Sequence, residues 1–144
     1  MSLTIEERFS HALHSTARAW RLALDRRMKE LGLSQASWLA IGSLAKYGPV
    51  PQTELARLLG IEDPSMVSMV DRMVKAGHME RQPSPTDRRV KLVALTDSGR
   101  AVYAHLRSLA DPFREELLGG VDRDKLAMIT EFLESLQAAI ESKA

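Results

Sequence analysis

The sequence predicts a mainly α-helical protein of 144 residues that contains one small β-hairpin. Apolar residues recur every three or four positions over most of the chain, which is the spacing of amphipathic helices. This period is lost only over residues 78–95, where two short segments flank a loop with two prolines. Glycines and capping residues divide the helical regions from one another.

The first predicted helix covers residues 5–31, and Gly32 ends it. Its apolar side chains form one stripe, at Ile5, Phe9, Leu13, Ala17, Trp20, Leu24, Met28 and Leu31. Ser34 is placed to cap a second helix that ends at Gly48-Pro49. A short helix over residues 52–59 follows, and Gly60 is placed to end it in the left-handed conformation.

The next helix is expected to have Asp63 as its cap and Pro64 at its first helical position, where a missing N–H costs nothing. It runs to about Ala76 and stops at Gly77. Together with the helix over 52–59 it forms a helix-turn-helix. Residues 78–82 and 90–95 then form a hairpin with a long basic tip, so the predicted fold is a winged helix-turn-helix.

Two long helices are predicted after the hairpin. Thr96 caps the first, in which Pro112 should produce a kink or a break before Gly119-Gly120 end it. Asp122 caps the last helix, which is apolar over more than one face. A helix over residues 5–31 would span about 40 Å. We therefore expect the first and last helices to pack together and against a second copy, as a two-fold dimer.

Composition excludes several classes of protein. There is no Cys, which excludes disulfide modules, Cys nucleophiles and Cys-type zinc sites. No apolar run approaches the roughly 20 residues of a membrane helix, and the N-terminus lacks a signal-peptide pattern. We expect a soluble, cytoplasmic protein without a cofactor.

No catalytic residues are predicted, because the chain has no Gly-rich phosphate loop and no His-Glu-x-x-His arrangement. His11 and His14 lie three residues apart and could share a helix face, as metal ligands do. Solvated or internally bonded histidines are the simpler interpretation. A metal site at these two histidines stays an alternative.

The formal net charge of +1 conceals a basic cluster in the predicted hairpin. Between residues 81 and 91 there are four basic side chains and one acid, Asp87. A basic cluster beside turn residues can contact phosphate, but it can also be an ordinary solvated loop. Charge alone leaves both interpretations open.

The helix beginning near residue 63 has the features of a recognition helix. A helix in a major groove presents short or hydrogen-bonding side chains from its N-terminal part. Ser65, Ser68 and Arg72 fall on one face, and Pro64 and Met66 lie at its edge, where they could touch thymine methyl groups. Ordinary exposure of the two serines is the alternative.

Several short motifs occur together in a fixed order. They are Ala19-Trp20-Arg21, Gln35 through Trp38, Glu54-Leu55-Ala56 through Leu59-Gly60, Ile61-Glu62-Asp63-Pro64-Ser65, Val67, Asp71, Gly77, Arg81-Gln82, and Asp87-Arg88-Arg89 through Leu95-Thr96. With these motifs the chain resembles the MarR family of bacterial winged-helix transcription regulators, most closely its SlyA branch, over residues 9–142.

The resemblance implies a single MarR-type domain over residues 1–144 that binds double-stranded DNA as a homodimer. The winged core would cover about 34–96, and the dimerisation helices about 5–31 and 97–142. It also implies a pseudo-palindromic operator, read by one recognition helix and one wing from each copy. The alternatives are a metal-responsive regulator and a winged helix that docks proteins without binding DNA.

The resemblance also assigns roles to single residues. Arg89 would enter a minor groove, Asp87 would orient it, and Arg88 would contact phosphate or the same groove. Further phosphate contacts are implied for Gln52, Thr53, Arg81 and Lys91. Two positions depart from the family pattern, because Pro51 replaces a capping Thr or Ser and Ser68 stands where SlyA-type sequences often have Arg.

MarR-type regulators often respond to small aromatic or lipophilic acids. The positions of the family pocket that match here are Arg18, Arg21 and Trp38. The two arginines could fork onto a carboxylate, and the indole could stack on an aromatic ring. Alternatively, Trp38 belongs to the core and the arginines pair with acids such as Asp25.

Overall fold

A computed structural model describes residues 2–143, which form two compact units that divide between Ala110 and Asp111. The elements of the described chain are α1 (Ile5–Met28), the 3-10 turn η1 (Lys29–Leu31), α2 (Gln35–Tyr47), β1 (Val50–Pro51), α3 (Gln52–Leu59), α4 (Asp63–Lys75), β2 (Met79–Pro83), β3 (Lys91–Leu95), α5 (Asp97–Leu118) and α6 (Arg123–Ser142). This order confirms the predicted class, a mainly helical fold with a winged helix-turn-helix.

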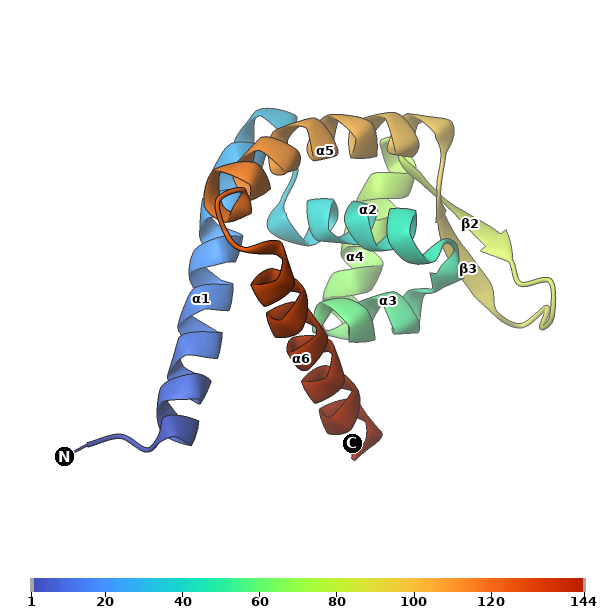
Figure 1. The fold of residues 1–144 in the computed structure, drawn as a ribbon. Coiled ribbons are helices and arrows are strands. Elements are labelled where there is room, and N and C mark those ends of the chain that lie inside the picture. Colours follow the sequence, from blue (N-terminus) through green and yellow to red (C-terminus); the bar gives the residue numbers. More distant parts are fainter. Residues whose placement is uncertain (1, 144) are drawn as a thin grey trace. The chain divides into compact units, whose positions relative to one another are not determined.

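In the first unit, α2, α3 and α4 lie beside the hairpin of β2 and β3, whose tip extends away from the helices (Figure 1). The core of this unit is rich in methionine, and its buried members include Met28, Met66, Met69, Met73 and Met79. An unbranched, flexible side chain fills the irregular gaps between elements that meet at different angles. This core therefore fixes the helix-turn-helix and the base of the hairpin relative to each other.

The sheet has three strands in the order β1-β3-β2, and both pairings are antiparallel. The hairpin strands were predicted, but β1 was not. It pairs Val50 with Val93 and Pro51 with Leu92. Two residues are too few to show the alternation of a strand, and a proline is tolerated there because β1 lies at the edge of the sheet.

Most predicted helix ends are confirmed. The hydroxyl of Ser34 accepts a hydrogen bond from the Ser37 amide at 3.2 Å, which caps α2. The Thr96 hydroxyl accepts one from the Gly99 amide at 3.1 Å. Gly60 ends α3 with φ at 65°, in the left-handed region that favours glycine.

Two predicted boundaries are wrong. The residue that precedes α4 is Glu62, whose carbonyl accepts from the Met66 amide at 3.0 Å, so Asp63 is already helical and caps nothing. The α-helical part of the first helix ends at Met28, because the chain tightens into the 3-10 turn η1 before Gly32. Such tightening is common at helix ends, where carbonyls lack partners further along the helix.

The apolar stripe of α1 divides into two parts. Leu24 and Met28 are buried in the first unit. Ile5 and Leu13, in the first half of the helix, are exposed to 66% and 37%. Only the second half of the stripe therefore serves the core of this unit.

The expected break at Pro112 is wrong, because α5 is one α-helix through that residue. A proline removes one helical hydrogen bond, and the turns on either side keep theirs. In the second unit Asp122 caps α6 as predicted, and its side chain accepts from the amides of Asp124 at 2.8 Å and Lys125 at 3.1 Å.

The last helix exposes much of its apolar surface. None of the residues of α6 is buried, and Met128, Ile129 and Ile140 are exposed to 70%, 45% and 60%. A soluble single-copy domain rarely leaves so large an apolar face open.

Candidate functional site

The outer face of α4 carries the polar side chains that were predicted to share it. Pro64, Ser65, Ser68 and Arg72 are all exposed. Arg72 Nη1 donates to Ser68 Oγ at 3.0 Å, so these two side chains lie against each other along the helix. Short hydroxyl side chains leave room for the helix to approach a base-pair edge closely.

The prediction that Met66 lies at the edge of this face is wrong. Its side chain is fully buried beside Met69 and Val70 in the core. The neighbouring Val67 is instead 40% exposed. Met66 and Val67 are adjacent apolar residues, and one step of about 100° along the helix separates the directions of their side chains. Val67 is therefore the apolar side chain that α4 offers to a partner.

The loop between β2 and β3 is held by its own hydrogen bonds. Ser84 Oγ accepts from the amides of Thr86 and Asp87, each at 3.3 Å. The Ser84 amide donates to the carbonyl of Val90 at 3.0 Å, and the Val90 amide donates to the carbonyl of Asp87 at the same distance. The tip is thus a structured turn rather than an open loop.

Asp87 and Arg89 form a pair at this tip. The Asp87 carboxylate accepts from the Arg89 amide at 3.0 Å, from Nε at 3.2 Å and from the terminal Nη2 at 3.2 Å. The Arg89 side chain is nevertheless 89% exposed. The pair therefore sets the direction of a guanidinium that is open to solvent.

The same contacts affect the acid. The hydrogen bonds from the Arg89 side chain and backbone lower the pKa of the Asp87 carboxyl below its ordinary value. These hydrogen bonds therefore favour the ionised carboxylate over the protonated acid.

Three other predicted contact residues are exposed near these elements. Arg88 lies at the tip, Lys91 begins β3 opposite Pro83, and Thr53 lies in the first turn of α3. Pro51 precedes α3 without a side-chain cap, as the sequence indicated.

Gln52 and Arg81 are brought into direct contact, together with a residue whose role the sequence did not suggest. Arg81 Nη2 donates to Gln52 Oε1 at 3.1 Å and to Asp71 Oδ1 at 2.6 Å. These bonds compete with the predicted phosphate contacts of Gln52 and Arg81. Asp71 was visible only as a motif residue, because its partner lies ten residues further along the chain.

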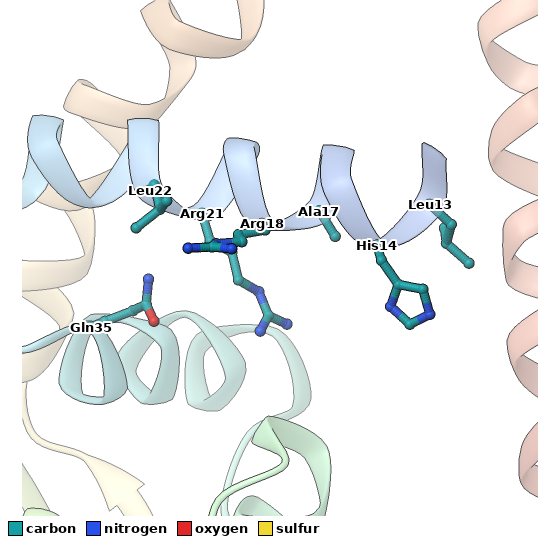
Figure 2. A pocket seen from close by; sticks show the side chains of 7 residues that line it. All are labelled: Leu13, His14, Ala17, Arg18, Arg21, Leu22 and Gln35. Atoms are coloured by element: carbon teal, nitrogen blue, oxygen red, sulfur yellow. The ribbon is translucent and has the colours of Figure 1, made fainter. Parts of the chain in front are cut away.

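A hollow of about 430 Å³ lies along α1 and reaches the start of α2. Figure 2 shows that Arg18, Arg21 and His14 project from α1 on the side where Gln35 of α2 lies. Its complete lining is Leu13, His14, Ala17, Arg18, Arg21, Leu22 and Gln35. The hollow therefore combines two cationic side chains with an apolar strip, which suits an organic anion.

Trp38 does not line this hollow. Its side chain is 4% exposed, and its indole Nε1 donates to Asp25 Oδ1 at 2.9 Å. Of the three effector residues that the resemblance implied, the structure thus brings Arg18 and Arg21 together and places Trp38 in the core. Gln35 and His14 were missed, because neither belongs to a charge or aromatic pattern.

The histidines of α1 form no metal centre with their neighbours. His11 Nε2 lies 3.5 Å from Ser15 Oγ. Across residues 2–143, no three His, Asp or Glu side chains gather closely enough to hold a metal ion. Along the same stretch, no helix combines the length and the apolar character that crossing a membrane requires.

Comparison with known proteins agrees with this geometry. The sequence pattern of the MarR family matches residues 33–91, which include the helix-turn-helix, β2 and the tip of the wing. The crystal structure of transcriptional regulator PA3341 is similar over 93% of this chain and 98% of that one, with 35% identity and a TM-score of 0.85.

Two more distant structures share the fold. One is CouR from Rhodococcus jostii RHA1 bound to p-coumaroyl-CoA, at 21% identity, with 94% of this chain and 95% of that one covered and a TM-score of 0.81. The other is a mutant of MarR from E. coli complexed with operator DNA, at 24% identity, with 90% and 93% covered and a TM-score of 0.73.

The fold and the matches define the class as a transcriptional regulator with a winged-helix DNA-binding fold. The chain belongs to the MarR family. The SlyA-like branch stays a prediction.

Proposed function

We propose that this protein regulates transcription by binding, as a homodimer, to a pseudo-palindromic DNA operator. The observation that carries the proposal is the exposed Arg89 guanidinium, which three hydrogen bonds to Asp87 aim outward from the tip of the wing. A hairpin that served only to complete the sheet would gain little from such a fixed, open cation. A narrow minor groove attracts an inserted arginine through its negative potential.

The outer face of α4 suits a major groove. Ser65 and Ser68 supply hydroxyls to base edges, Val67 supplies an apolar surface for a thymine methyl, and Arg72 reaches further along the groove. Pro64 lies at the start of the same face. Thr53, Arg88 and Lys91 surround these elements and would contact phosphates, which position the protein without reading sequence.

The exposed apolar faces of α1 and α6 support the dimer. Ile5 and Leu13 of α1 and Met128, Ile129 and Ile140 of α6 leave large apolar surfaces in contact with water. Burying them against a second copy gains about 25 cal/mol for each Å² removed from water. Two-fold symmetry would then set two recognition helices about one turn of DNA apart.

The direct test is fluorescence anisotropy against a randomised duplex pool at several salt concentrations. We expect selection of a roughly palindromic site and a steep salt dependence, because several phosphates are contacted. Arg89→Ala should bind the selected duplex more weakly, whereas Arg26→Ala, at an exposed arginine of α1, should not. Weak binding without salt dependence would instead favour a protein-docking module.

We further propose that the hollow beside α1 takes a small aromatic or lipophilic acid that weakens DNA binding. Arg18 and Arg21 would hold the carboxylate, and Leu13, Ala17 and Leu22 would cover the apolar body. The relative bound to p-coumaroyl-CoA, and BpsR of Bordetella bronchiseptica, whose DNA binding is regulated by 6-hydroxynicotinic acid, support a ligand-responsive regulator.

Calorimetry with a panel of substituted benzoates tests this site. We expect heat of binding from at least one acid with the wild-type chain, and weaker binding after Arg21→Ala. Lys46→Ala, at an exposed cation outside the hollow, serves as the control. If no acid releases heat or changes the affinity for DNA, the hollow is not an effector site.

A further inference from the structure

Arg81 joins three elements of the first unit through one nitrogen atom. Nη2 donates to Asp71 Oδ1 in the middle of α4, at 2.6 Å, and to Gln52 Oε1 at the start of α3, at 3.1 Å. Arg81 itself lies in the middle of β2, where it pairs with Val93 of β3. The contact therefore connects the helix-turn-helix with the hairpin that carries the wing.

This arrangement differs from that of a phosphate-binding arginine. Nη2 carries two hydrogens, and the two oxygens of Asp71 and Gln52 use both of them. The Asp71 side chain is 59% exposed, so a DNA phosphate approaching this guanidinium would meet a carboxylate at the same place. The phosphate and the carboxylate are both negative and repel each other at close range, which makes this guanidinium a weaker contact for an anion.

We call the contacts of Arg81 with Asp71 and Gln52 the bridge. The position of Asp71 on α4 shows which part of the molecule this bridge holds. Asp71 precedes Arg72 and lies three residues after Ser68, so it shares one turn with two side chains of the DNA-facing surface. The buried methionines hold α4 from its inner side, while the bridge holds its outer side to β2 and α3. A contact on the outer side fixes the rotation of the helix about its own axis, which flexible core side chains do less strictly.

We propose that Arg81 is a positioning residue, which sets α4 and the wing in one fixed relation so that both grooves are read together. The inference rests on the proposed DNA-binding function. Base contacts require side chains to be held to within about 0.5 Å. Non-specific binding to phosphates does not require that accuracy, so the bridge should affect specific binding alone.

Asp71→Asn separates the two roles of Arg81, because the expected effects have opposite signs. If Arg81 positions α4, removal of the acid weakens binding to the selected operator by about 3- to 10-fold, the range for a charge-assisted pair near the surface. If Arg81 contacts phosphate, removal of the acid frees the guanidinium and lowers repulsion, so binding becomes tighter.

Arg81→Lys gives a second, independent comparison. A lysine keeps the charge, but its ammonium ends one bond short of the Nη2 position, so it cannot keep both contacts to Asp71 and Gln52 in the present geometry. A positioning role predicts that Arg81→Lys loses about as much operator affinity as Asp71→Asn, and that the double variant loses no more than either single one. A phosphate contact predicts that the lysine retains most of the affinity.

The experiment measures the affinity of the full-length chain for its selected operator and for an unrelated duplex at several salt concentrations. We expect both variants to lower the ratio of specific to non-specific binding and to keep the salt slope of the wild type. The matched control is Arg88→Ala, which removes a proposed phosphate contact. It should lower the salt slope by about 1 and weaken binding to both duplexes alike. Thermal melting of each variant establishes that it is folded.

Tighter operator binding by Asp71→Asn, or a shallower salt slope for Arg81→Lys, would overturn the positioning role while leaving the proposed function intact. A wild-type chain that selects no duplex at all would remove the proposed function, and this inference with it.

Discussion

The recognition helix α4 and the wing both present side chains to solvent, but they are held in place by different means. Met66, Met69 and Met73 anchor α4 in the core of the first unit. The wing tip has no core of its own, and hydrogen bonds around Ser84 and Asp87 fix its shape. The helix is therefore held by core packing on its inner side and by the Arg81 contacts on its outer side, whereas the tip is held by local polar contacts alone.

This difference should separate the effects of mutation. Changes beneath α4 act on the stability of the whole unit, because its core is shared. Changes at the wing tip act on DNA binding and leave folding almost untouched, because the tip contacts little beyond itself.

The largest expected effect lies beneath α4. Met66→Ala should lower the free energy of unfolding by about 2–5 kcal/mol, because it leaves a cavity in a packed core. Urea denaturation measures this change. The neighbouring Val67→Ala, at a 40% exposed side chain, is the control and should change stability by less than about 1 kcal/mol. Equal losses for the two variants would contradict the observed orientation of α4.

The next effect belongs to the wing. Arg89→Ala should weaken operator binding by about 1–3 kcal/mol, because it removes the cation that we propose enters the minor groove. The urea midpoint should stay at the wild-type value, since the side chain is 89% exposed. Anisotropy and denaturation of the same preparation test both statements. A large loss of stability would show that the tip is not an independent local structure.

A smaller effect is expected on the polar face of α4. Ser68→Ala should change operator affinity by no more than about 1 kcal/mol, because the hydroxyl already accepts a bond from the Arg72 guanidinium and a further bond from it to a base would contribute little net energy. The preference for a particular base at the DNA position that Ser68 contacts should change clearly, although the overall affinity changes little. Selection from a randomised duplex pool measures that preference, and a loss as large as that of Arg89→Ala would make α4, not the wing, the main source of affinity.

The smallest effect is a titration. Hydrogen bonds from Arg89 lower the pKa of Asp87 in the folded protein. Their stabilisation of the fold is therefore fully present above the ordinary pKa of 3.8, and it is lost as the pH falls through the pKa of the folded state. NMR of the side-chain carboxyl carbon should show a midpoint below 3.8. Arg89→Ala should move that midpoint upward, and an unchanged midpoint would show that the pair does not form in solution.

The fold could be predicted largely from the sequence, because its signals are local. Glycines ended helices where left-handed backbone was required, and two prolines marked the loop of the hairpin. The sequence-based prediction was wrong where core packing decides which of two neighbouring residues is buried. Met66 and Val67 both fit the apolar period, and only the position of the core shows which one is buried.

The candidate site was predicted where the partners are close in sequence and missed where they are distant. Asp87 and Arg89 are two residues apart, within one motif. Arg81 meets partners ten and twenty-nine residues away, and a basic residue in a basic segment is naturally interpreted as a phosphate contact. Trp38 showed the same limit, because its bond to Asp25 crosses from α2 to α1.

The short strand β1 has a consequence for the order in which the sheet assembles. β2 and β3 are joined by residues 84–90 alone, whereas Val50 and Val93 are 43 positions apart in the sequence. Closing a longer loop has a larger entropy cost, so the hairpin can form before β1 joins it. We expect the amide of Val50 to exchange with deuterium faster than those of the β2–β3 ladder. The start of α3, which follows β1 directly, would then be the part of the helix-turn-helix that opens first in the folded protein.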